Sequence, residues 1–288
     1  MKRIAYLGTG LLGSGIAEAS AKRGNEICVW NRTTEKARAL EQFGARVAST
    51  PADAVRGAEH IHLILKDDTV VDAVIAALRP GLADGAIIID HTTNEPALTA
   101  ERTRRLNAEG VRYIHCPVFI GPAGARESQG IVLASGPQVL FDAIKDELGK
   151  MATRVEYYGE RPDLAAVYKL CGNAYTIGIA ALVADVFAIA AGAGVAPADT
   201  IQIMDFFNPT SVIANRTRRM AAADHAPSFE LEMARKDVRL MVETADSVPL
   251  SVLPGVAARM DELLAQGHGS EDLNVIGKDA LSAYTRRS

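Results

Sequence analysis

Short apolar runs alternate with longer amphipathic stretches over roughly the first half of the chain. The runs are rich in Val, Ile and Leu and have the length of strands, whereas the stretches between them are rich in Ala, Glu and Arg and have the length of helices. Strands that are apolar at consecutive positions are buried on both faces, as in parallel sheets covered by helices on both sides. We therefore predict a doubly wound α/β domain with strands at 3–8, 26–30, 46–49, 60–65, 86–90, 111–118, 130–135 and 154–159.

The pattern changes near Arg161 and Pro162, after which strand-like runs no longer occur. Helical patterns punctuated by proline and glycine follow. We predict helices at 163–193, from 196, and at 211–223, 229–245 and 250–266. The sequence thus predicts an α/β domain in residues 1–161 and an all-helical domain in residues 162–288.

The longest apolar tract runs from Asn173 to Ala196 and is long enough to cross a membrane. Asp185 near its middle, its many Ala and Gly residues and the absence of basic flanks favour a helix buried between protein surfaces, so we expect no membrane association. A helix this apolar on most sides needs a partner, which predicts a homodimer or homotetramer.

Composition and charge narrow the class of function. The formal net charge of −4 gives no general attraction to nucleic acid or anionic lipid, so we expect neither as a partner. Cys28, Cys116 and Cys171 are far apart and lack CxxC or Cys/His spacing, so we expect neither a disulfide nor a metal site. A reducing, cytoplasmic location fits this cysteine usage, and the apolar run after Met1 is too short for a signal peptide.

A glycine-rich loop follows the first predicted strand. The stretch "YLGTGLLGSG" places Gly8, Gly10 and Gly13 in a G-x-G-x-x-G pattern that opens a helix. The first glycine permits the tight turn, the second lets a pyrophosphate approach the backbone, and the third lets helix and strand pack closely. The loop predicts dinucleotide binding by residues 8–13, that is Gly8, Thr9, Gly10, Leu11, Leu12 and Gly13.

The residues after the second predicted strand indicate which dinucleotide is bound. NAD-binding domains usually present a carboxylate there to the ribose 2′-hydroxyl, but this chain has Asn31, Arg32 and Thr33. A guanidinium with neighbouring amide and hydroxyl groups suits a 2′-phosphate, so we predict NADP(H). In the alternative reading Arg32 is only solvated and Thr33 or Thr34 caps the next helix.

A lysine stands near the start of the long apolar helix, in "VYKLCGNAY". A buried ammonium group is costly unless it is paired or functional. Lys169 and Asn173 are four residues apart and therefore share one helix face, so both side chains can point into one cleft.

Five motifs together, "GTGLLGSG", "NRT", "CPVFIGPAGA", "YKLCGN" and "ARKDVRL", resemble the β-hydroxyacid dehydrogenase family over nearly the whole chain. That family includes 3-hydroxyisobutyrate dehydrogenase and glyoxylate/succinic semialdehyde reductases, and 6-phosphogluconate dehydrogenase is a larger relative. The resemblance implies a Rossmann-type NADP-binding domain followed by a helical substrate and dimerisation domain. It also implies an NADP(H)-dependent oxidoreductase that acts on a small carbonyl compound or β-hydroxyacid.

The resemblance also implies roles for individual residues. Lys169 matches the family's general acid/base and Asn173 its substrate-holding asparagine, so hydride transfer is expected in an interdomain cleft between Thr93 and Lys169. Thr93 and Lys236 match positions near the nicotinamide, and Leu65 and Lys66 match a segment that passes the cofactor. The alternatives are a Lys169 that reaches solvent, a helix-capping Thr93 and a Lys236 that is only a surface charge. His91 and His115, at strand ends, could assist proton transfer, although hydrogen bonding is the commoner role.

One motif departs from the family pattern. Where the family usually shows Pro-Val-Ser-Gly-Gly, this chain has Phe119, Ile120 and Gly121 in the substrate-binding positions. A hydroxyl donor is lost and apolar bulk is gained, which favours apolar or uncharged carbonyl compounds over small hydroxy acids. Two alternatives therefore stay open: an imine reductase, although such enzymes usually lack the lysine, and a non-catalytic NADP(H)-binding protein.

Overall fold

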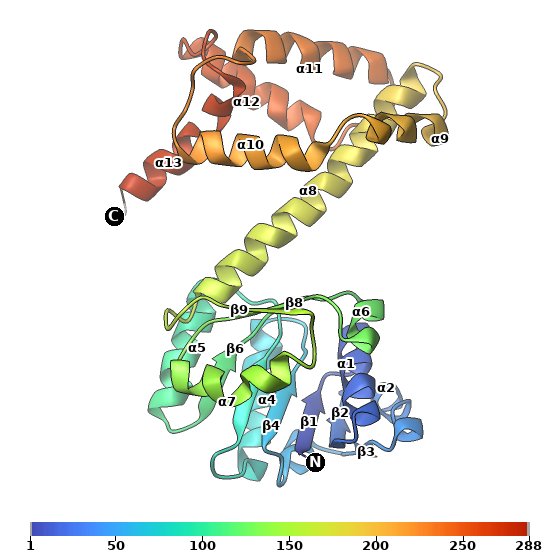
Figure 1. Ribbon diagram of the computed structural model, residues 1–288, viewed down its shortest axis with the longest axis vertical. Coiled ribbons are helices and arrows are strands. Elements are labelled where there is room, and N and C mark those ends of the chain that lie inside the picture. The colour runs from blue at the N-terminus through green and yellow to red at the C-terminus, as the bar shows by residue number, and fades with distance from the viewer. Residues whose placement is uncertain (1, 287–288) are drawn as a thin grey trace. The chain divides into compact units, whose positions relative to one another are not determined.

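The computed structural model of the chain describes residues 2–286 and divides into two compact units, which meet along the chain between Asn173 and Ala174 (Figure 1). The division falls within helix α8 (Leu164–Gly192). The boundary predicted at residues 161 and 162 lies just before the start of this helix, whereas the two units divide within it. The first turns of α8, which carry Lys169, therefore group with the α/β unit.

The first unit contains a parallel sheet with strand order β3-β2-β1-β4-β5-β6 in the described residues. Its strands are β1 (Arg3–Leu7), β2 (Glu26–Trp30), β3 (Arg46–Val47), β4 (His60–Leu63), β5 (Ile87–Asp90) and β6 (Arg112–His115). The order reverses between β1 and β4, where such sheets bind ligands outside the carboxyl ends of their strands. The predicted doubly wound fold is confirmed.

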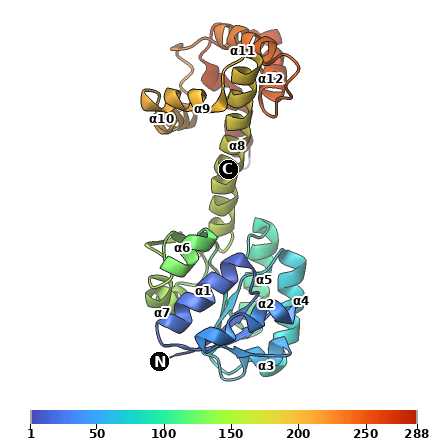
Figure 2. The same cartoon turned by 90° about the vertical axis from the view of Figure 1, so that its right-hand side faces the viewer.

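Helices cover both faces of this sheet, as Figure 2 shows. One core lies between the sheet and α1 (Leu11–Lys22), α2 (Thr34–Arg38) and α7 (Gln138–Leu148). The other lies between the sheet and α3 (Pro51–Val55), α4 (Asp68–Leu78) and α5 (Pro96–Ala108). Every residue of β4 and β5 is buried, because the apolar runs of these central strands supply both cores.

The run predicted as one strand at 111–118 is broken in the structure. It forms β6 and then β7 (Val118–Phe119), which joins a second sheet with β8 (Ile131–Ala134) and β9 (Arg154–Tyr157). The break falls at Pro117, which has no N–H to donate to a ladder. Because β7 pairs antiparallel with β8, the prediction of strands in parallel alignment throughout was wrong at this point. The short helix α6 (Pro122–Glu127) follows β7.

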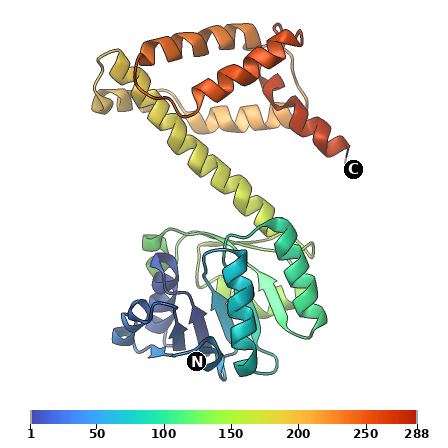
Figure 3. The same ribbon diagram turned by 180° about the vertical axis from the view of Figure 1, so that it is seen from behind.

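The second unit is helical, as predicted (Figure 3). It contains the rest of α8, α9 (Pro197–Thr200), α10 (Pro209–Ala221), α11 (Leu231–Ala245), α12 (Leu253–Ala265) and α13 (Lys278–Thr285), the last of which was not predicted. Its core lies mainly between α11 and α12. Asp185 of α8 accepts hydrogen bonds from the backbone N–H groups of Ser251, Val252 and Leu253, at 2.6, 2.9 and 2.9 Å, just where α12 begins.

Helix α8 is long and apolar enough to cross a membrane by length and composition, and 11% of its most apolar window is buried. The carboxylate of Asp185, which belongs to this helix, accepts hydrogen bonds from backbone N–H groups at the start of α12. Asp185 thus joins α8 to α12 within the helical unit.

Candidate cofactor cleft and lysine site

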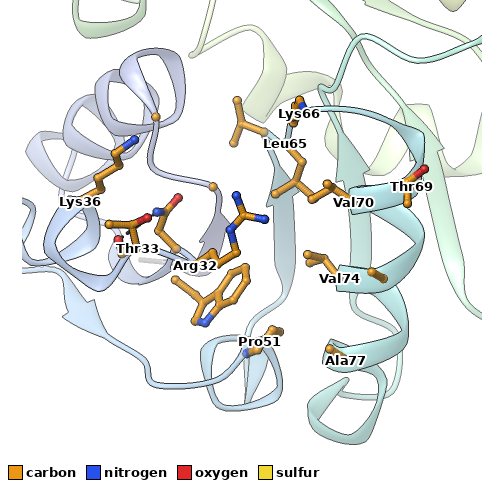
Figure 4. A pocket seen from close by; sticks show the side chains of 16 residues that line it. Arg32, Thr33, Lys36, Pro51, Leu65, Lys66, Thr69, Val70, Val74 and Ala77 are labelled. Carbon is orange, nitrogen blue, oxygen red and sulfur yellow. Dashed lines mark hydrogen bonds between the residues drawn. The ribbon is translucent and has the colours of Figure 1, made fainter.

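A cleft of about 700 Å³ opens at the carboxyl ends of β1, β2 and β4 (Figure 4). Arg32, Thr33 and Lys36 line one side, and α4 lines the other through Val70 and Val74. This position is the switch point of the sheet, where the predicted glycine loop also lies. The complete lining comprises Gly8, Gly10, Trp30, Asn31, Arg32, Thr33, Lys36, Pro51, Ile64, Leu65, Lys66, Thr69, Val70, Ala73, Val74 and Ala77.

The glycine loop has the geometry that a pyrophosphate requires. Gly8 has a φ of 100°, and a methyl group on it would overlap the carbonyl of Ile64. A methyl group on Gly13 would overlap the Gly8 carbonyl, so strand and helix pack closely only because this residue is glycine. Beside Gly10 there is open space at the N-terminus of α1, where free N–H groups favour an anion. The hydroxyl of Thr9 is buried and has no hydrogen-bond partner in the described chain. These residues fit a dinucleotide.

Basic side chains give the cleft its charge. Arg32, Lys36 and Lys66 line it, and no Asp or Glu does so in the part of the chain that the structure describes. Asn31 makes hydrogen bonds on both sides of its amide group. Its Oδ1 accepts from Thr9 N at 3.0 Å, and its Nδ2 donates to Thr33 O at 2.9 Å. Asn31 thus holds the two loops together, while Arg32 is exposed and directed into the cleft (Figure 4).

Lys169 and Asn173 form a second group within the same unit. The ammonium nitrogen of Lys169 donates to Asn173 Oδ1 at 3.0 Å and lies 4.2 Å from the centre of the Phe119 ring. Both residues are half-buried, and no ion pair of Lys169 occurs within residues 2–286. Burial lowers the pKa of Lys169 below its ordinary value, because water is removed without a carboxylate taking its place. An amine in this state can give up its proton more readily than an exposed lysine can.

Family profiles match both parts of the chain. Residues 3–159, more than half of it, match the NAD binding domain of 6-phosphogluconate dehydrogenase. Residues 164–278 match a domain described as the NAD-binding domain of NADP-dependent 3-hydroxyisobutyrate dehydrogenase. The chain belongs to the β-hydroxyacid dehydrogenase family. Membership confirms the resemblance of the motifs, and it makes the chain a member of a family of nicotinamide-dependent dehydrogenases and reductases.

Three relatives are 24–26% identical to this chain. An uncharacterized oxidoreductase of Shewanella frigidimarina is 26% identical over 92% of this chain and 92% of its own length. Glyoxylate/succinic semialdehyde reductase 1 of Arabidopsis thaliana is 24% identical over 94% of this chain and 95% of its own length. The cytokine-like nuclear factor N-PAC of Xenopus tropicalis is 26% identical over 86% of this chain, which spans only 47% of that protein.

Several solved structures share the fold. An imine reductase from Myxococcus stipitatus in complex with NADP+ has a TM-score of 0.88 at 20% identity, over 96% of this chain and 99% of its own. A reductive aminase from Aspergillus terreus has a TM-score of 0.84 at 19% identity, over 96% and 98%. Streptomyces aurantiacus imine reductase has a TM-score of 0.85 at 25% identity, over 96% and 99%. At such identities these likenesses establish the architecture of this family member and not its substrate.

The other predicted site residues of this dehydrogenase-family chain lie in several places. Leu65 lines the cleft, and its N–H donates to the hydroxyl of Thr92 at 3.0 Å. Thr93, the next residue, is exposed in the loop after β5. Lys236 lies in the helical unit, where it pairs with Asp237 at 2.9 Å. Leu11 is exposed at the start of α1 and, like Leu12, Ile120 and Gly121, does not line the cleft.

Several residues of the cleft were not predicted from the sequence. Trp30 directly precedes the Asn-Arg-Thr triplet, and Lys36 follows it by one helical turn. On α4, the wall is formed by positions spaced three and four apart, a signal of one helix face that could have been used: Thr69, Val70, Ala73, Val74 and Ala77. Their contribution was missed because nothing in a sequence says which face of α4 borders the glycine loop.

Buried histidines link the strands behind the cleft. His62 of β4 contacts His91 through Nδ1 and Nε2 at 2.8 Å, and its own Nε2 contacts Glu147 of α7 at 2.8 Å. Nδ1 of His91 lies 2.6 Å from the carbonyl of Cys116. His60 also contacts the Glu147 carboxylate. A continuous hydrogen-bonded chain therefore crosses the sheet from α7 to the end of β6.

The donors and acceptors along this hydrogen-bonded chain indicate which atoms carry protons. The carbonyl of Cys116 can only accept, so Nδ1 of His91 donates. Burial lowers the pKa of His91 to about 3, so the ring is neutral and its Nε2 accepts from His62. Nε2 of His62 then donates to Glu147, which is ionised: burial acts to raise the pKa of Glu147, but hydrogen bonds from His60 and His62 lower it well below its usual range. The ring of His62 thus links His91 to Glu147.

His115 has a comparable structural role. Its Nε2 donates to the carbonyl of Thr92 at 2.9 Å, and burial lowers its pKa. Asp90, at the end of β5, accepts from Thr92 N at 2.9 Å and from Tyr113 OH at 2.7 Å. These bonds fix the loop that carries Thr92 and Thr93. No group of three or more His, Cys, Asp or Glu side chains in residues 2–286 is arranged to hold a metal ion.

Proposed function

We propose that this protein is an NADP(H)-dependent reductase that converts a small aldehyde or ketone to the alcohol, with Lys169 as the general acid. The observation that carries the proposal is the half-buried Lys169 amine, which lies 3.0 Å from Asn173 Oδ1 and has no carboxylate partner among residues 2–286. The family relationship and the glyoxylate/succinic semialdehyde reductase of Arabidopsis thaliana support reduction of a carbonyl group.

Each residue has a distinct part in this reaction. The bound nicotinamide would supply or accept hydride. Lys169 would stabilise the negative charge that develops on the carbonyl oxygen and donate a proton to it; in the reverse direction the neutral amine would accept the hydroxyl proton. Asn173 would orient the amine and hold the substrate oxygen. Thr93 and Lys236 remain candidates for the nicotinamide end, on the family resemblance alone.

The basic cleft supports NADP(H) rather than NAD(H). Arg32 and Lys36 can bind a 2′-phosphate, and Asn31 occupies the position where a carboxylate would repel it. We expect Arg32→Ala to weaken NADPH binding about tenfold or more while changing the NADH dissociation constant less than about twofold. Isothermal titration calorimetry of both nucleotides measures this.

Arg38→Ala is the matched control, because Arg38 is exposed on α2, the short helix that follows Arg32, and does not line the cleft. It should leave both dissociation constants unchanged. If wild-type protein binds NADH more tightly than NADPH, the assignment of the cofactor is wrong.

Substitution of the proton donor tests the reaction. Lys169→Ala should lower kcat for carbonyl reduction by about 10²- to 10⁴-fold, since a positioned acid contributes that much, and should change NADPH affinity less than about twofold. The assay follows nicotinamide absorbance over a panel of aldehydes and ketones. Lys150→Ala, at an exposed lysine of the same unit, is the control. Turnover that survives in Lys169→Ala would remove Lys169 from the chemistry.

Imine reduction is the second candidate. The structural likeness to imine reductases and the apolar Phe119 ring beside Lys169 both favour it. Cyclic imines therefore belong in the same NADPH panel. Faster turnover of imines that is also insensitive to Lys169→Ala would favour this candidate, and absence of turnover with either class would favour a non-catalytic NADP(H)-binding protein.

A further inference from the structure

The Phe119 side chain is held in a defined position beside the lysine. Phe119 ends β7 and pairs in register with Ile131 of β8, so its backbone belongs to a sheet rather than to a free loop. Its ring centre lies 4.2 Å from the Lys169 amine. A ring face carries partial negative charge and attracts an ammonium group, so this contact is favourable in itself.

Gly172 makes room for that ring. A methyl group on Gly172 would lie 2.7 Å from Cε1 and 3.1 Å from Cε2 of Phe119 and would overlap Cζ. Such a side chain would push the ring away from α8. Gly178, further along the same helix, has no atom within 4 Å of the position of a methyl group, so a methyl group there would meet no neighbour of this kind.

The side of the amine that faces the ring is therefore poor for an anion. The ring occupies this side of Lys169 and Asn173 Oδ1 accepts on another, and the ring offers no hydrogen-bond donor to a carboxylate. The family's serine hydroxyl is absent at this position. Pro122, at the first turn of α6, has no N–H to replace it. A carboxylate placed against the ring would lose water on that side without gaining a hydrogen-bond partner there.

We propose that Phe119, fixed against α8 by Gly172, excludes carboxylates from the space beside Lys169 and selects uncharged, largely apolar carbonyl compounds. The inference rests on the proposed reductase function and specifies its substrate class. Phe119 is thereby a specificity-determining residue, and Gly172 positions it.

Two isosteric aldehydes test the selection. Succinic semialdehyde and 4-methylpentanal differ only in carrying a carboxylate or an isopropyl group at the far end. With NADPH, wild-type protein should favour 4-methylpentanal in kcat/KM by about tenfold or more, because the apolar ring contacts an isopropyl group favourably and gives a carboxylate no donor. Phe119→Ser should shift this ratio about tenfold toward the semialdehyde, whereas Phe119→Leu, which stays apolar, should keep it within about threefold.

Gly172→Ala tests whether the position of the Phe119 ring, and not only its presence, sets the ratio of kcat/KM for the two aldehydes. It should change the ratio in the wild-type background, where the ring must move, and leave it unchanged in the Phe119→Ser background. Gly178→Ala is the matched control and should leave the ratio unchanged in both backgrounds. Circular dichroism of each variant verifies folding.

The outcomes separate this inference from the proposed function. A wild-type preference for the semialdehyde, or a ratio that Phe119→Ser leaves unchanged, would overturn the inference while leaving a reductase in place. If neither aldehyde is reduced, calorimetric binding of both to the protein with NADP+, which cannot turn over, still decides it. Equal affinity for the two aldehydes would then refute the selection, and weaker binding of the semialdehyde that Phe119→Ser relieves would support it.

Discussion

Burial of the amine, rather than a partner of opposite charge, shifts the pKa of Lys169. Burial lowers its pKa, and the neutral amide of Asn173 does not restore it. Since reduction needs the protonated amine, kcat/KM should fall as the pH rises through the pKa of Lys169, below the ordinary lysine value of about 10.4.

Asn173→Asp tests this arrangement. A carboxylate at hydrogen-bond distance stabilises the ammonium form and raises the pKa of Lys169, so the basic limb of the pH profile for kcat/KM should move to higher pH. Asn173→Ala removes the acceptor without adding charge and should lower kcat/KM without that upward movement. A limb that stays in place in Asn173→Asp would mean that another group titrates.

Local sequence signals predict single residues well where the chemistry is local. The roles of Gly8 and Gly13 follow from one short motif, and the shared face of Lys169 and Asn173 follows from helical spacing. The contact between Phe119 and Gly172 does not, because it joins a strand end and a helix far apart in the chain. The sequence showed that a serine was missing but not what the phenylalanine touches.

At the scale of elements, the histidine chain joins β4, β5 and α7 and makes the α/β unit sensitive to acid. His91 is neutral when folded, with a pKa of about 3, but takes up a proton near pH 6.5 when unfolded. Below pH 6.5 the unfolded state therefore binds more protons, and stability falls as the pH is lowered. The lowered pKa of His115 acts with the same sign.

We expect His91→Asn to flatten this dependence by one proton, or about 1.4 kcal/mol per pH unit, between about pH 6 and pH 4.5. Asparagine can still donate to the carbonyl of Cys116. The groups that face His91 are His62, His115, Cys116 and Glu147. The free energy of opening, from hydrogen exchange of the β5 amides, is the measurement.

Ile88→Val in β5 is the control for that experiment. Ile88 is fully buried, so the substitution should lower stability by about 1 kcal/mol at every pH without changing the slope. An equal slope in wild type and His91→Asn would mean that His91 is not the group that takes up the proton on unfolding.

The type of most elements, helix or strand, could be predicted because each apolar run had the spacing of only one type. The exceptions have physical causes. The strand expected at 111–118 breaks at Pro117, a residue visible in the sequence whose effect was underestimated. α13 was missed because it is only 8 residues long, so its apolar positions repeat over only about two turns.

At the scale of the whole molecule, we propose a homodimer formed through α8. Much of the apolar surface of this helix is exposed in the single chain: Ile177 is 68% exposed and Leu182 is 45% exposed. Contiguous apolar surface of this kind favours association, which the sequence also predicted.

Light scattering after size exclusion should give twice the chain mass of 30.6 kDa at micromolar concentration. Leu182→Glu should yield monomers, because an isolated charge in an apolar interface is costly. Leu98→Glu, at an exposed leucine of α5, should leave the mass unchanged. A wild-type mass equal to one chain would refute the dimer.

The position of Trp30 has a practical consequence. The chain contains 1 tryptophan, and its indole lines the basic cleft. Excitation energy that this indole absorbs in the near ultraviolet would be transferred to a reduced nicotinamide bound in the same unit, because the emission spectrum of indole overlaps the absorption spectrum of dihydronicotinamide. Binding of the reduced coenzyme would thus lower the tryptophan fluorescence and raise the fluorescence of the nicotinamide. Coenzyme binding can therefore be followed without an added label.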